Sequence, residues 1–514
     1  MVKVAAVENA FVWFRNDLRV THNPALLAAS QYSATHGGRV YALLVTSPLE
    51  WRSIHNWGLP KASYYVRTVS VLRRELSKRG IEMLLHTPTA KNATEYYKAL
   101  ASEIVQLCKS QNCSAVYMNA EYDGVALERD AAVASALDTA GILHHTTHDQ
   151  CVVPVGKVLT QSGTPYKVFS QFKKTWIRYI EEHGLDMIDS EPTEIEKSST
   201  ILPDIELDLG YDMHEYPNWD LNALHTTFPA GETEARKRLH EFLQKSVSGY
   251  HEDRNHFMEG GASKLSAPLA VGAISLTECL LAARIANKGA LNSGSPGLLT
   301  WMSELCWRDF YRHVLFHFPH VGRGASFRPE FEHLSWRGWP PNIEPAAEEH
   351  FQAWCEGRTG YPIVDAAMRQ LRREGWLCNR LRMVVAMFLT KDLRIHWRRG
   401  EQHFNQFLVD YDFSSNNGGW QWSASTGTDA QPYFRIFNPL LQSEKFDPSG
   451  DYIRRYVDEL SKVSAPSIHD PFKRCKGFDQ LKYPRPIVDH SKVKEQVLAL
   501  FTAATTVTTK RPAD

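Results

Sequence analysis

Residues 39–86 begin with RVYALLV (39–45), continue with ASYYVRTVSVLRRELSKRG (62–80) and end with EMLLH (82–86). The first and last runs are short and mainly apolar, which is typical of strands that are buried on both faces of a sheet. In the middle run apolar residues recur at helical spacing, and Gly80 suits the end of a helix. A strand, a helix and a second strand in this order predict a parallel crossover unit.

Two more apolar runs extend this unit, AFVWF (10–14) and AVYMN (115–119). Strands that alternate with helical patterns predict a doubly wound parallel sheet, and we place this Rossmann-like α/β domain at residues 8–146. The segment contains no G-x-G-x-x-G turn, so the sequence does not support ordinary dinucleotide binding there.

The remainder of the chain changes character twice. Residues 147–228 are rich in Pro, Ser, Thr, Asp and Glu, which is typical of a long connector. Residues 229–503 carry an almost entirely helical pattern, in which PIVDAAMRQLRREG (362–375) has proline at its first helical position and glycine at its end. We therefore expect a connector and an all-α domain after the α/β domain, with a short tail at 504–514.

Composition limits the function classes. The chain has 514 residues, and its 58 basic and 58 acidic residues cancel, so any nucleic-acid-binding surface must be local. The cysteines form no C-x-x-C pair and no zinc-like spacing with histidine, so we expect no metal site and a reducing intracellular compartment. No long apolar run occurs, which predicts a soluble protein without a membrane anchor.

Two helical segments combine charge with aromatic residues. In TWMSELCWRDFYRH (300–313), Trp301, Glu304 and Arg308 share one stripe, which a purely buried helix would not show. An exposed i,i+4 ion pair between Glu304 and Arg308 is the alternative explanation.

The second segment is GWLCNRLRMVVAMFLTKDLRIHWRRG (375–400), where residues 380–399 hold five arginines and one lysine against one aspartate. This local positive charge is the footprint expected for a phosphate backbone, with a solvated helix face as the alternative. Asn379 beside it could read a base edge, because its amide both donates and accepts.

Two further segments are rich in small residues. In DYDFSSNNGGWQWSASTGTDAQPYFRIFNP (410–439), two tryptophans stand behind a doubled glycine, which indicates a large flat group nearby. The carboxylates and amides around them can hydrogen-bond a ligand's heteroatoms. GYHEDRNHFMEGGASKLSAPLAVG (249–272) leads from Gly-Gly-Ala-Ser into a helix and could form a phosphate nest.

Together these segments resemble the photolyase/cryptochrome family. The matching motifs occur in family order and span nearly the whole chain: FVWFRNDLR (11–19), ELCWRDFYRH (304–313), TGYPIVDAAMRQL (359–371), NRLRM (379–383) and NNGGWQW (416–422). The resemblance implies an N-terminal α/β antenna domain, a connector and a helical domain that holds folded FAD.

By the family pattern, the residues that would hold FAD are Tyr250, Ser263, Lys264, Leu265, Ser266, Trp301, Arg308, Arg382, Asp410, Asp412 and Asn416. The earlier ones would contact the phosphates and ribityl chain, and the later ones would surround the isoalloxazine, with Asn416 near its N5. Gly418 and Gly419 would let the chain turn closely under the ring. Ala262 stands where the family commonly has a hydroxyl, so one phosphate contact would be missing.

The resemblance also implies a partner, DNA containing cyclobutane pyrimidine dimers, which would be bound by Arg254, Trp307, Tyr311, Arg380, Met383, Trp422 and Gln442. A dimer pairs poorly, so flipping it from the duplex costs less than flipping a normal base. Excited reduced FAD would give the dimer one electron, the ring would split and the electron would return. Glu304 and Asn379 would stabilise the dimer radical. We expect a monomer, nuclear in a eukaryote and cytoplasmic in a bacterium.

Single residues favour one branch of the family. The (6-4) photolyases and animal cryptochromes carry histidines in the segment that corresponds to 379–383, whereas NRLRM here looks like a class I cyclobutane pyrimidine dimer photolyase, a carbon–carbon lyase. Plant cryptochromes have an aspartate where this chain has Asn416, and many cryptochromes end in long signalling tails. A blue-light photoreceptor cryptochrome is the alternative. A light-independent flavoprotein or a plain nucleic-acid-binding module is more distant.

Two further roles follow from the resemblance. Trp420, Trp397 and an outer tryptophan would relay electrons from the surface to oxidised flavin; RPEFEHLSW (328–336) favours Trp336 for the outer position, and Trp339 remains open. His55 could match a contact to an antenna chromophore, either methenyltetrahydrofolate or a deazaflavin. Val125 and Ala126 stand where folate binders often carry Asn and Glu, so an empty antenna site is equally consistent with the sequence.

Overall fold

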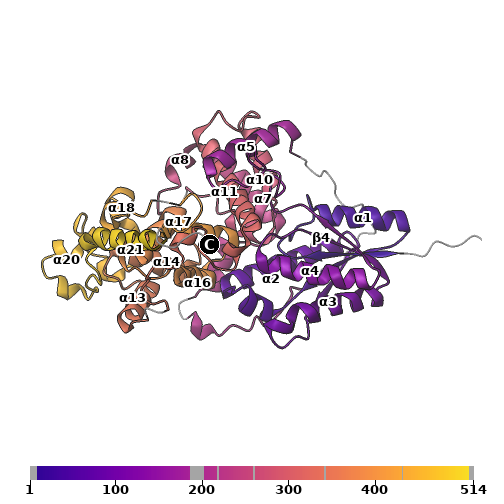
Figure 1. Cartoon of the computed structure of the whole chain (residues 1–514), viewed down its shortest axis with the longest axis horizontal. Coiled ribbons are helices and arrows are strands. Elements are labelled where there is room, and N and C mark those ends of the chain that lie inside the picture. Colours follow the sequence, from indigo (N-terminus) through magenta and orange to yellow (C-terminus); the bar gives the residue numbers. More distant parts are fainter. Residues whose placement is uncertain are drawn as a thin grey trace, which may run out of the picture.

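A computed structural model describes residues 8–185, 202–216, 219–258, 261–340, 343–430 and 432–508. Figure 1 shows the sheet-containing part at one end of the molecule and the C-terminal helices at the other. This arrangement confirms the expected fold class. The domain limits 8–146, 147–228 and 229–503 stay predictions.

The N-terminal part contains one parallel sheet with the order β3-β2-β1-β4-β5. Its strands are β1 (Asn9–Phe14), β2 (Val40–Val45), β3 (Glu82–His86), β4 (Cys113–Asn119) and β5 (Leu143–Thr147). The first four lie where the apolar runs predict them. The fifth was not predicted, because it is an edge strand whose sequence, LHHTT, has no buried residue and so no apolar signal.

Helices cover both faces of this sheet. They are α1 (Pro24–His36), α2 (Leu59–Ser77), α3 (Ala93–Ser110) and α4 (Gly124–Thr139). Alternate residues of β1 point to opposite faces: Val12 belongs to the core beneath α1 and α2, and Trp13 to the core beneath α3 and α4. Helix α2 starts earlier than predicted, because Pro60 suits its first turn, and Gly80 is left-handed after it.

The sheet has a topological switch point. Strand β1 pairs with β2 on one side and with β4 on the other, so the order of connection reverses there. Ligands of doubly wound sheets bind in the crevice at the carboxyl ends of the strands at such a point. Asn16 follows β1 and Asp123 follows β4, so both lie at this crevice.

The connector contains a helix that was not predicted, α5 (Phe169–His183), and a shorter one, α6 (Leu221–Thr227). Phe172, Trp176 and Ile180 form the buried stripe of α5. The Trp176 indole donates to Asp309 Oδ2 at 2.8 Å, and the same carboxylate accepts from two backbone amides of the connector. The connector is thereby fastened to the helical part of the chain.

The helical region is confirmed. Its helices are α7 (Glu232–Lys245), α8 (Tyr250–Asp253), α9 (Ser266–Val271), α10 (Leu276–Ala286), α11 (Pro296–His317), α12 (Pro319–Gly322), α13 (Pro345–Glu356), α14 (Pro362–Glu374), α15 (Asn379–Met387), α16 (Trp397–Phe407), α17 (Phe413–Ala424), α18 (Pro439–Phe446), α19 (Asp451–Tyr456), α20 (Pro471–Arg474) and α21 (Val493–Thr508). Helix α14 begins at Pro362 and ends at left-handed Gly375, as its sequence predicts.

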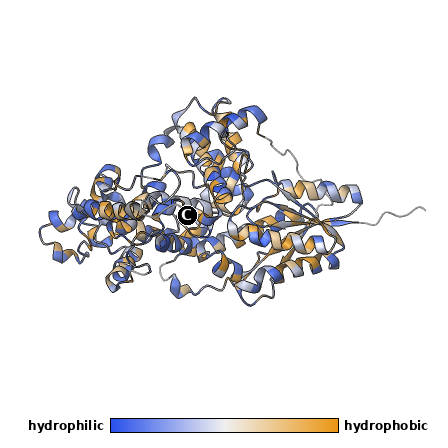
Figure 2. Ribbon diagram, in the orientation of Figure 1, coloured by the Kyte–Doolittle hydropathy of each residue, from blue (hydrophilic) through white to orange (hydrophobic). Residues whose placement is uncertain are grey.

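Hydrophilic and hydrophobic residues alternate along most helices in Figure 2, as amphipathic packing requires. None of the helices in the described part of the chain combines the length and apolar character needed to cross a membrane.

Candidate functional site

Helices α8, α9, α11, α15 and α17 enclose a cavity of about 520 Å³, within the usual size range of cofactor pockets. Nearly all the predicted site residues line it: Tyr250, Arg254, Ser263, Lys264, Leu265, Ser266, Trp301, Glu304, Trp307, Arg308, Tyr311, Asn379, Arg380, Arg382, Met383, Asp410, Asp412, Asn416, Trp420 and Trp422. Gln442 is not among the lining residues and lies in α18, so the structure does not bring it to the cavity.

One side of the cavity presents buried polar groups without protein partners. Arg382 donates to Asp410 Oδ2 at 2.7 Å, while Asp410 Oδ1 is buried and has no hydrogen-bond partner among the residues that the structure describes. A buried acceptor left unpaired is costly, so this oxygen fits a donor on a bound ligand. Ser263 to Ser266 lie at the start of α9, where backbone amides are available to an anion.

Asp412 links two helices in the polar wall of the cavity. Its Oδ2 accepts from Arg308 at 2.9 Å and from Arg312 at 2.8 Å, and its Oδ1 accepts from Ser414, Ser415 and the Ser415 amide. Burial alone would raise the pKa of Asp412, but Arg308 and Arg312 lower this pKa well below its usual range. The carboxylate is therefore ionised, and it caps the N-terminus of α17.

Hydrogen bonds to the protein fix the side chain of Asn416. Its Nδ2 donates to Asn405 Oδ1 at 2.7 Å and to the Glu401 carbonyl at 3.2 Å, which leaves its own Oδ1 for the cavity. The neighbouring Asn417 turns the other way and donates to Glu401 Oε1 at 2.9 Å. Asn416 therefore lines the cavity, whereas Asn417 is hydrogen-bonded in the protein interior.

The doubled glycine does not form a turn, and this expectation is wrong. Gly418 and Gly419 lie inside α17. A Cβ on Gly418 would stand 2.2 Å from the Tyr311 ring, so Gly418 lets α17 and α11 approach. A Cβ on Gly419 would meet no described atom within 4 Å apart from the backbone of its own helix, and Gly419 lines the cavity. The second glycine therefore keeps space for a ligand.

These two glycines give a matched pair of variants. We expect Gly419→Ala to fold normally but to bind flavin at least tenfold more weakly, because the added methyl enters the ligand's space. Gly418→Ala should instead lower the free energy of unfolding by about 1–3 kcal/mol, the usual cost of overpacking. Flavin absorbance per protein and urea midpoints separate the two effects. Equal flavin content in Gly419→Ala and the unaltered protein would contradict this reading.

The other side of the cavity is aromatic and accessible to solvent. The Arg254 and Glu304 side chains form an ion pair at 30% and 32% exposure, so this end opens to the surface. Trp307 stacks face to face on Phe169 of α5, with ring centroids 3.6 Å apart. Sequence reasoning missed Phe169, because it belongs to the connector. The amphipathic stripe of α5 was the signal that could have found it.

The four tryptophans that are candidates for the electron relay differ in position and exposure. Trp420 lines the cavity and is 2% exposed, whereas Trp397 and Trp336 are buried outside it. Trp339 is partly exposed. Trp420 thus lines the cavity together with Trp301, Trp307 and Trp422, whereas Trp397, Trp336 and Trp339 are not among its lining residues.

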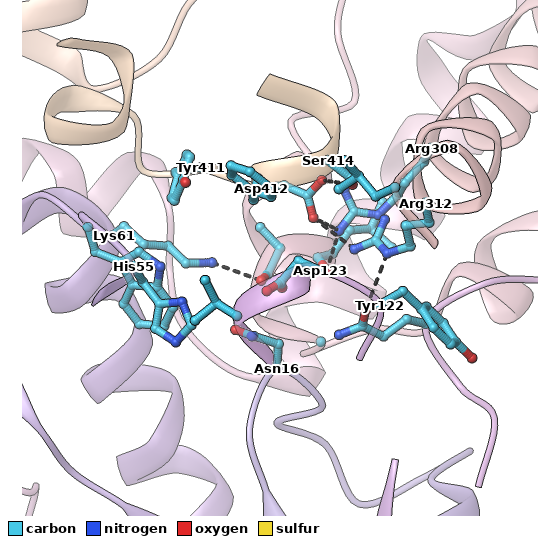
Figure 3. A pocket seen from close by; sticks show the side chains of 18 of the residues that line it. Asn16, His55, Lys61, Tyr122, Asp123, Arg308, Arg312, Tyr411, Asp412 and Ser414 are labelled. Atoms are coloured by element: carbon cyan, nitrogen blue, oxygen red, sulfur yellow. Dashed lines mark hydrogen bonds and ion pairs between the residues drawn. The ribbon is translucent and has the colours of Figure 1, made fainter. Parts of the chain in front are cut away.

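A second cavity of about 290 Å³ lies at the switch point, between the sheet and the helical part (Figure 3). Asn16, His55 and Asp123 line it from the α/β side, and Arg312 and Asp412 line it from the helical side. Arg312 Nη1 is buried and has no hydrogen-bond partner within the described part of the chain. Leu269, Arg308 and Asp412 line both cavities, so the two cavities are adjacent.

Lys61 points into this second cavity (Figure 3). Its Nζ donates to the Ala270 carbonyl at 2.8 Å, and burial lowers its pKa to about 7. His55 stacks on Trp57 and pairs with Glu50 at 3.3 Å. Val125 lines the same cavity. The apolar residue that stands where folate binders often carry a polar one is therefore part of this second cavity.

Comparisons with known proteins agree with this geometry. The family models that describe DNA photolyase and the FAD binding domain of DNA photolyase match residues 10–190 and 301–503. A deoxyribodipyrimidine photo-lyase from Vibrio cholerae is 38% identical over 500 residues, which cover 96% of this chain and 99% of that protein. The chain belongs to the DNA photolyase family.

Solved structures of the photolyase fold extend the match to three dimensions. A bacterial class III photolyase from Agrobacterium tumefaciens gives a TM-score of 0.81 at 32% identity, covering 98% of this chain and 99% of the other. A cryptochrome from Synechocystis sp. PCC6803 gives 0.77 at 25% identity, covering 96% and 99%. The predicted family and the FAD-binding domain are thus confirmed, and assignment to class I stays a prediction.

The buried Glu401 of this photolyase gives a pH test. Burial raises the pKa of the Glu401 carboxyl to about 7. The hydrogen bond from Asn417 and the positive charge of Arg398 lower this pKa, but by less than burial raises it. A raised carboxyl pKa contributes stability that is present below pH 4.5 and lost as pH rises through 7. Over this range the loss is on the order of 3 kcal/mol. We expect Glu401→Gln, which cannot ionise, to lose less stability than the unaltered protein between pH 5 and pH 8.

Urea midpoints of both proteins at the two pH values provide the measurement. The change in stability between the two pH values is compared between the two proteins, so the contributions of other groups that titrate in this range cancel. The same pH dependence in both proteins would show that Glu401 is ionised at neutral pH.

Proposed function

We propose that this chain is a deoxyribodipyrimidine photo-lyase, which binds DNA containing a cyclobutane pyrimidine dimer and splits the dimer with light. The observation that carries the proposal is a single cavity with a polar side suited to FAD and an aromatic, solvent-accessible side suited to a flipped dimer. Relatives that bear the enzyme's name support the same activity.

The polar side fits FAD. Asp410 Oδ1 offers an unpaired acceptor, the start of α9 offers amides to the phosphates, and Gly419 leaves room for the ring system. When bound and reduced, FAD supplies the excited-state electron that opens the dimer. Arg308, Arg382 and Asn416 orient this group, since each is fixed by hydrogen bonds to the protein.

The aromatic side fits two fused pyrimidines. Trp307 and Trp422 offer flat faces for the bases, and Asn379 offers an amide for a carbonyl. Glu304 is held by Arg254 at the mouth of the cavity and can bond the dimer's polar edge. Arg380, positioned by Asn255 at 3.0 Å, can contact the DNA backbone. Gln442 would contact DNA outside the cavity.

Trp420 and Trp397 are proposed to carry electrons to oxidised flavin. Trp420 stands in the cavity wall, and Trp397 belongs to α16, which packs on the helix of Trp420. Both indoles are buried, so an oxidised state formed on either one is shielded from water.

The second cavity is proposed as the antenna site. It lies at the switch point of the sheet, and Arg312 Nη1 is an unpaired donor that would suit an anionic group of a ligand. His55 and Trp57 offer a stacked aromatic wall. Whether methenyltetrahydrofolate or a deazaflavin binds there is settled by the absorbance spectrum of protein purified from its source. The monomeric state and the cellular compartment stay predictions.

The decisive experiment is repair. Reduced protein with single- or double-stranded DNA containing one thymine dimer is illuminated with blue light, and restored thymines are counted. We expect light-dependent restoration and none in the dark. A cryptochrome would change its flavin redox state in light without repairing DNA. A light-independent flavoprotein or a plain nucleic-acid-binding module would show no light response.

A further inference from the structure

Asn405 connects the walls of the two cavities. It belongs to α16, is 6% exposed and lines the second cavity, whereas Asn416 of α17 lines the first. Asn416 Nδ2 donates to Asn405 Oδ1 at 2.7 Å. A single hydrogen bond between two side chains therefore joins the second cavity to the cavity that fits FAD.

The orientation of the Asn416 amide follows from its partners. A backbone carbonyl only accepts hydrogen bonds, so the atom of Asn416 that lies 3.2 Å from the Glu401 carbonyl must be Nδ2. The same Nδ2 reaches Asn405 at the shorter distance of 2.7 Å, so Asn405 must present its acceptor, Oδ1. The oxygen of the Asn416 amide is then left for the first cavity. Two acceptors thus decide which atom of Asn416 faces a bound cofactor.

The backbone of Asn405 is fixed by the contact between α16 and the α/β domain. Its carbonyl accepts from the Gly58 amide at 3.0 Å, and a Cβ on Gly58 would lie 1.8 Å from the carbonyl oxygen of Gln406. Gln406 Nε2 also donates to Asn56 Oδ1 at 2.6 Å. Because the end of α16 is packed this closely against the segment before α2, Asn405 presents its acceptor to Asn416 from a rigid position.

The orientation of the Asn416 amide matters because its oxygen accepts hydrogen bonds and its nitrogen donates them. Reduced flavin carries a hydrogen on N5 of its central ring, whereas the same nitrogen of oxidised flavin is an acceptor. An oxygen of Asn416 near N5 therefore favours the reduced form, and a turned amide would favour the oxidised form. This step rests on the proposed function, in which Asn416 orients FAD.

We propose that Asn405 is a positioning residue, which holds the Asn416 amide with its oxygen toward the flavin and thereby favours reduced FAD, the form that the proposed repair reaction uses. Without the acceptor of Asn405, only the longer bond to the Glu401 carbonyl opposes rotation of the Asn416 amide. One N–H of Asn416 would then lack its partner, which is unfavourable in the protein interior. The amide would lose its fixed orientation, and the preference for reduced FAD would weaken.

Four FAD-loaded proteins test this assignment: the unaltered protein, Asn405→Leu, Asn416→Ala and the double variant. Leucine is similar in size to asparagine but offers no acceptor. The reduction potential of the bound flavin is measured by absorbance against a reference dye. We expect Asn405→Leu to shift the equilibrium about fivefold toward oxidised flavin, which is about 20 mV for a two-electron couple. In the Asn416→Ala background the same substitution should shift it less than twofold, because Asn405 acts through Asn416.

Gln406→Leu is the matched control. Gln406 is the next residue of α16 and contacts the α/β domain, but it is not among the described lining residues of either cavity. We expect Gln406→Leu to lower the urea midpoint and to leave the flavin potential unchanged. An unchanged potential in Asn405→Leu, or an equal shift in Gln406→Leu, would overturn the role of Asn405. An equal shift by Asn405→Leu with and without Asn416 would overturn it as well.

Failure of the proposed function looks different. If the unaltered protein, chemically reduced, does not repair dimers in light, the repair proposal fails, whereas the role of Asn405 is still decided by the flavin potentials. If Asn416→Ala leaves the potential unchanged, Asn416 does not tune the flavin, and the role of Asn405 is refuted with it. Flavin content per protein shows whether each variant still binds its cofactor.

Discussion

Replacing Asp412 by alanine should yield a protein that retains almost no FAD and unfolds at a markedly lower urea concentration. The carboxylate accepts from two buried arginines, Arg308 and Arg312, and from the first turn of α17. Removing one partner of a buried ion pair leaves uncompensated charge, at a cost of about 3–5 kcal/mol. The freed arginines would also disturb both cavities, because Asp412 lines each of them.

The matched control is Asp410→Ala. Asp410 pairs with Arg382 alone, and that guanidinium is 26% exposed, so water can solvate it when the carboxylate is lost. We expect Asp410→Ala to lose flavin as well, but to shift the urea midpoint much less than Asp412→Ala does. Flavin absorbance per protein and the two midpoints are the measurements. An Asp412→Ala protein with full flavin content and a normal midpoint would refute the supporting role assigned to this carboxylate.

The acid sensitivity of Asp412→Ala gives an independent check. Since the pKa of Asp412 is lowered in the folded protein, its contribution to stability is present above the ordinary aspartate pKa of 3.8 and is lost as pH falls below it. The variant should therefore lose less stability than the unaltered protein on acidification.

Much of the fold could be predicted from the sequence because buried parallel strands are almost continuously apolar. This signal located β1, β2, β3 and β4 to within about two residues. It failed for β5, an edge strand whose side chains are exposed or partly exposed. Helix α5 was missed for another reason: the polar composition on both sides of it hides a clear stripe of Phe172, Trp176 and Ile180.

The site was predicted by motif order, and periodicity alone would not have assembled it. Residues as far apart as Tyr250 and Trp422 meet in one cavity, which no local pattern reveals. Reading Gly418 as a turn was wrong because a helix accepts glycine where a neighbouring ring needs the space of its Cβ. Trp336 is buried, and Phe501, a residue remote in sequence, lies edge-on against its ring, which the lead-in motif could not report.

The second large effect concerns recognition of the lesion. We expect the Trp307→Ala protein to bind dimer-containing DNA roughly 10–100-fold more weakly. This loss corresponds to one lost stacking contact with a base, which is worth about 1–3 kcal/mol. One face of Trp307 is covered by Phe169, with ring centroids 3.6 Å apart and nearly parallel planes, so the indole is held rigid in the lining of the cavity that a flipped base would enter. Affinity for undamaged DNA should hardly change, because phosphate contacts dominate there. Binding to both DNAs is measured at several salt concentrations.

Two control variants separate stacking from charge. Phe169→Leu keeps Trp307 but removes its flat support, so we expect a smaller loss confined to dimer-containing DNA. Arg380→Gln removes a positive charge at the cavity, so it should weaken binding to damaged and undamaged DNA alike and reduce the salt slope by about 1. If Trp307→Ala instead weakened both DNAs equally, the indole would not be reading the flipped dimer. The aromatic side of the cavity would then serve only to support the flavin.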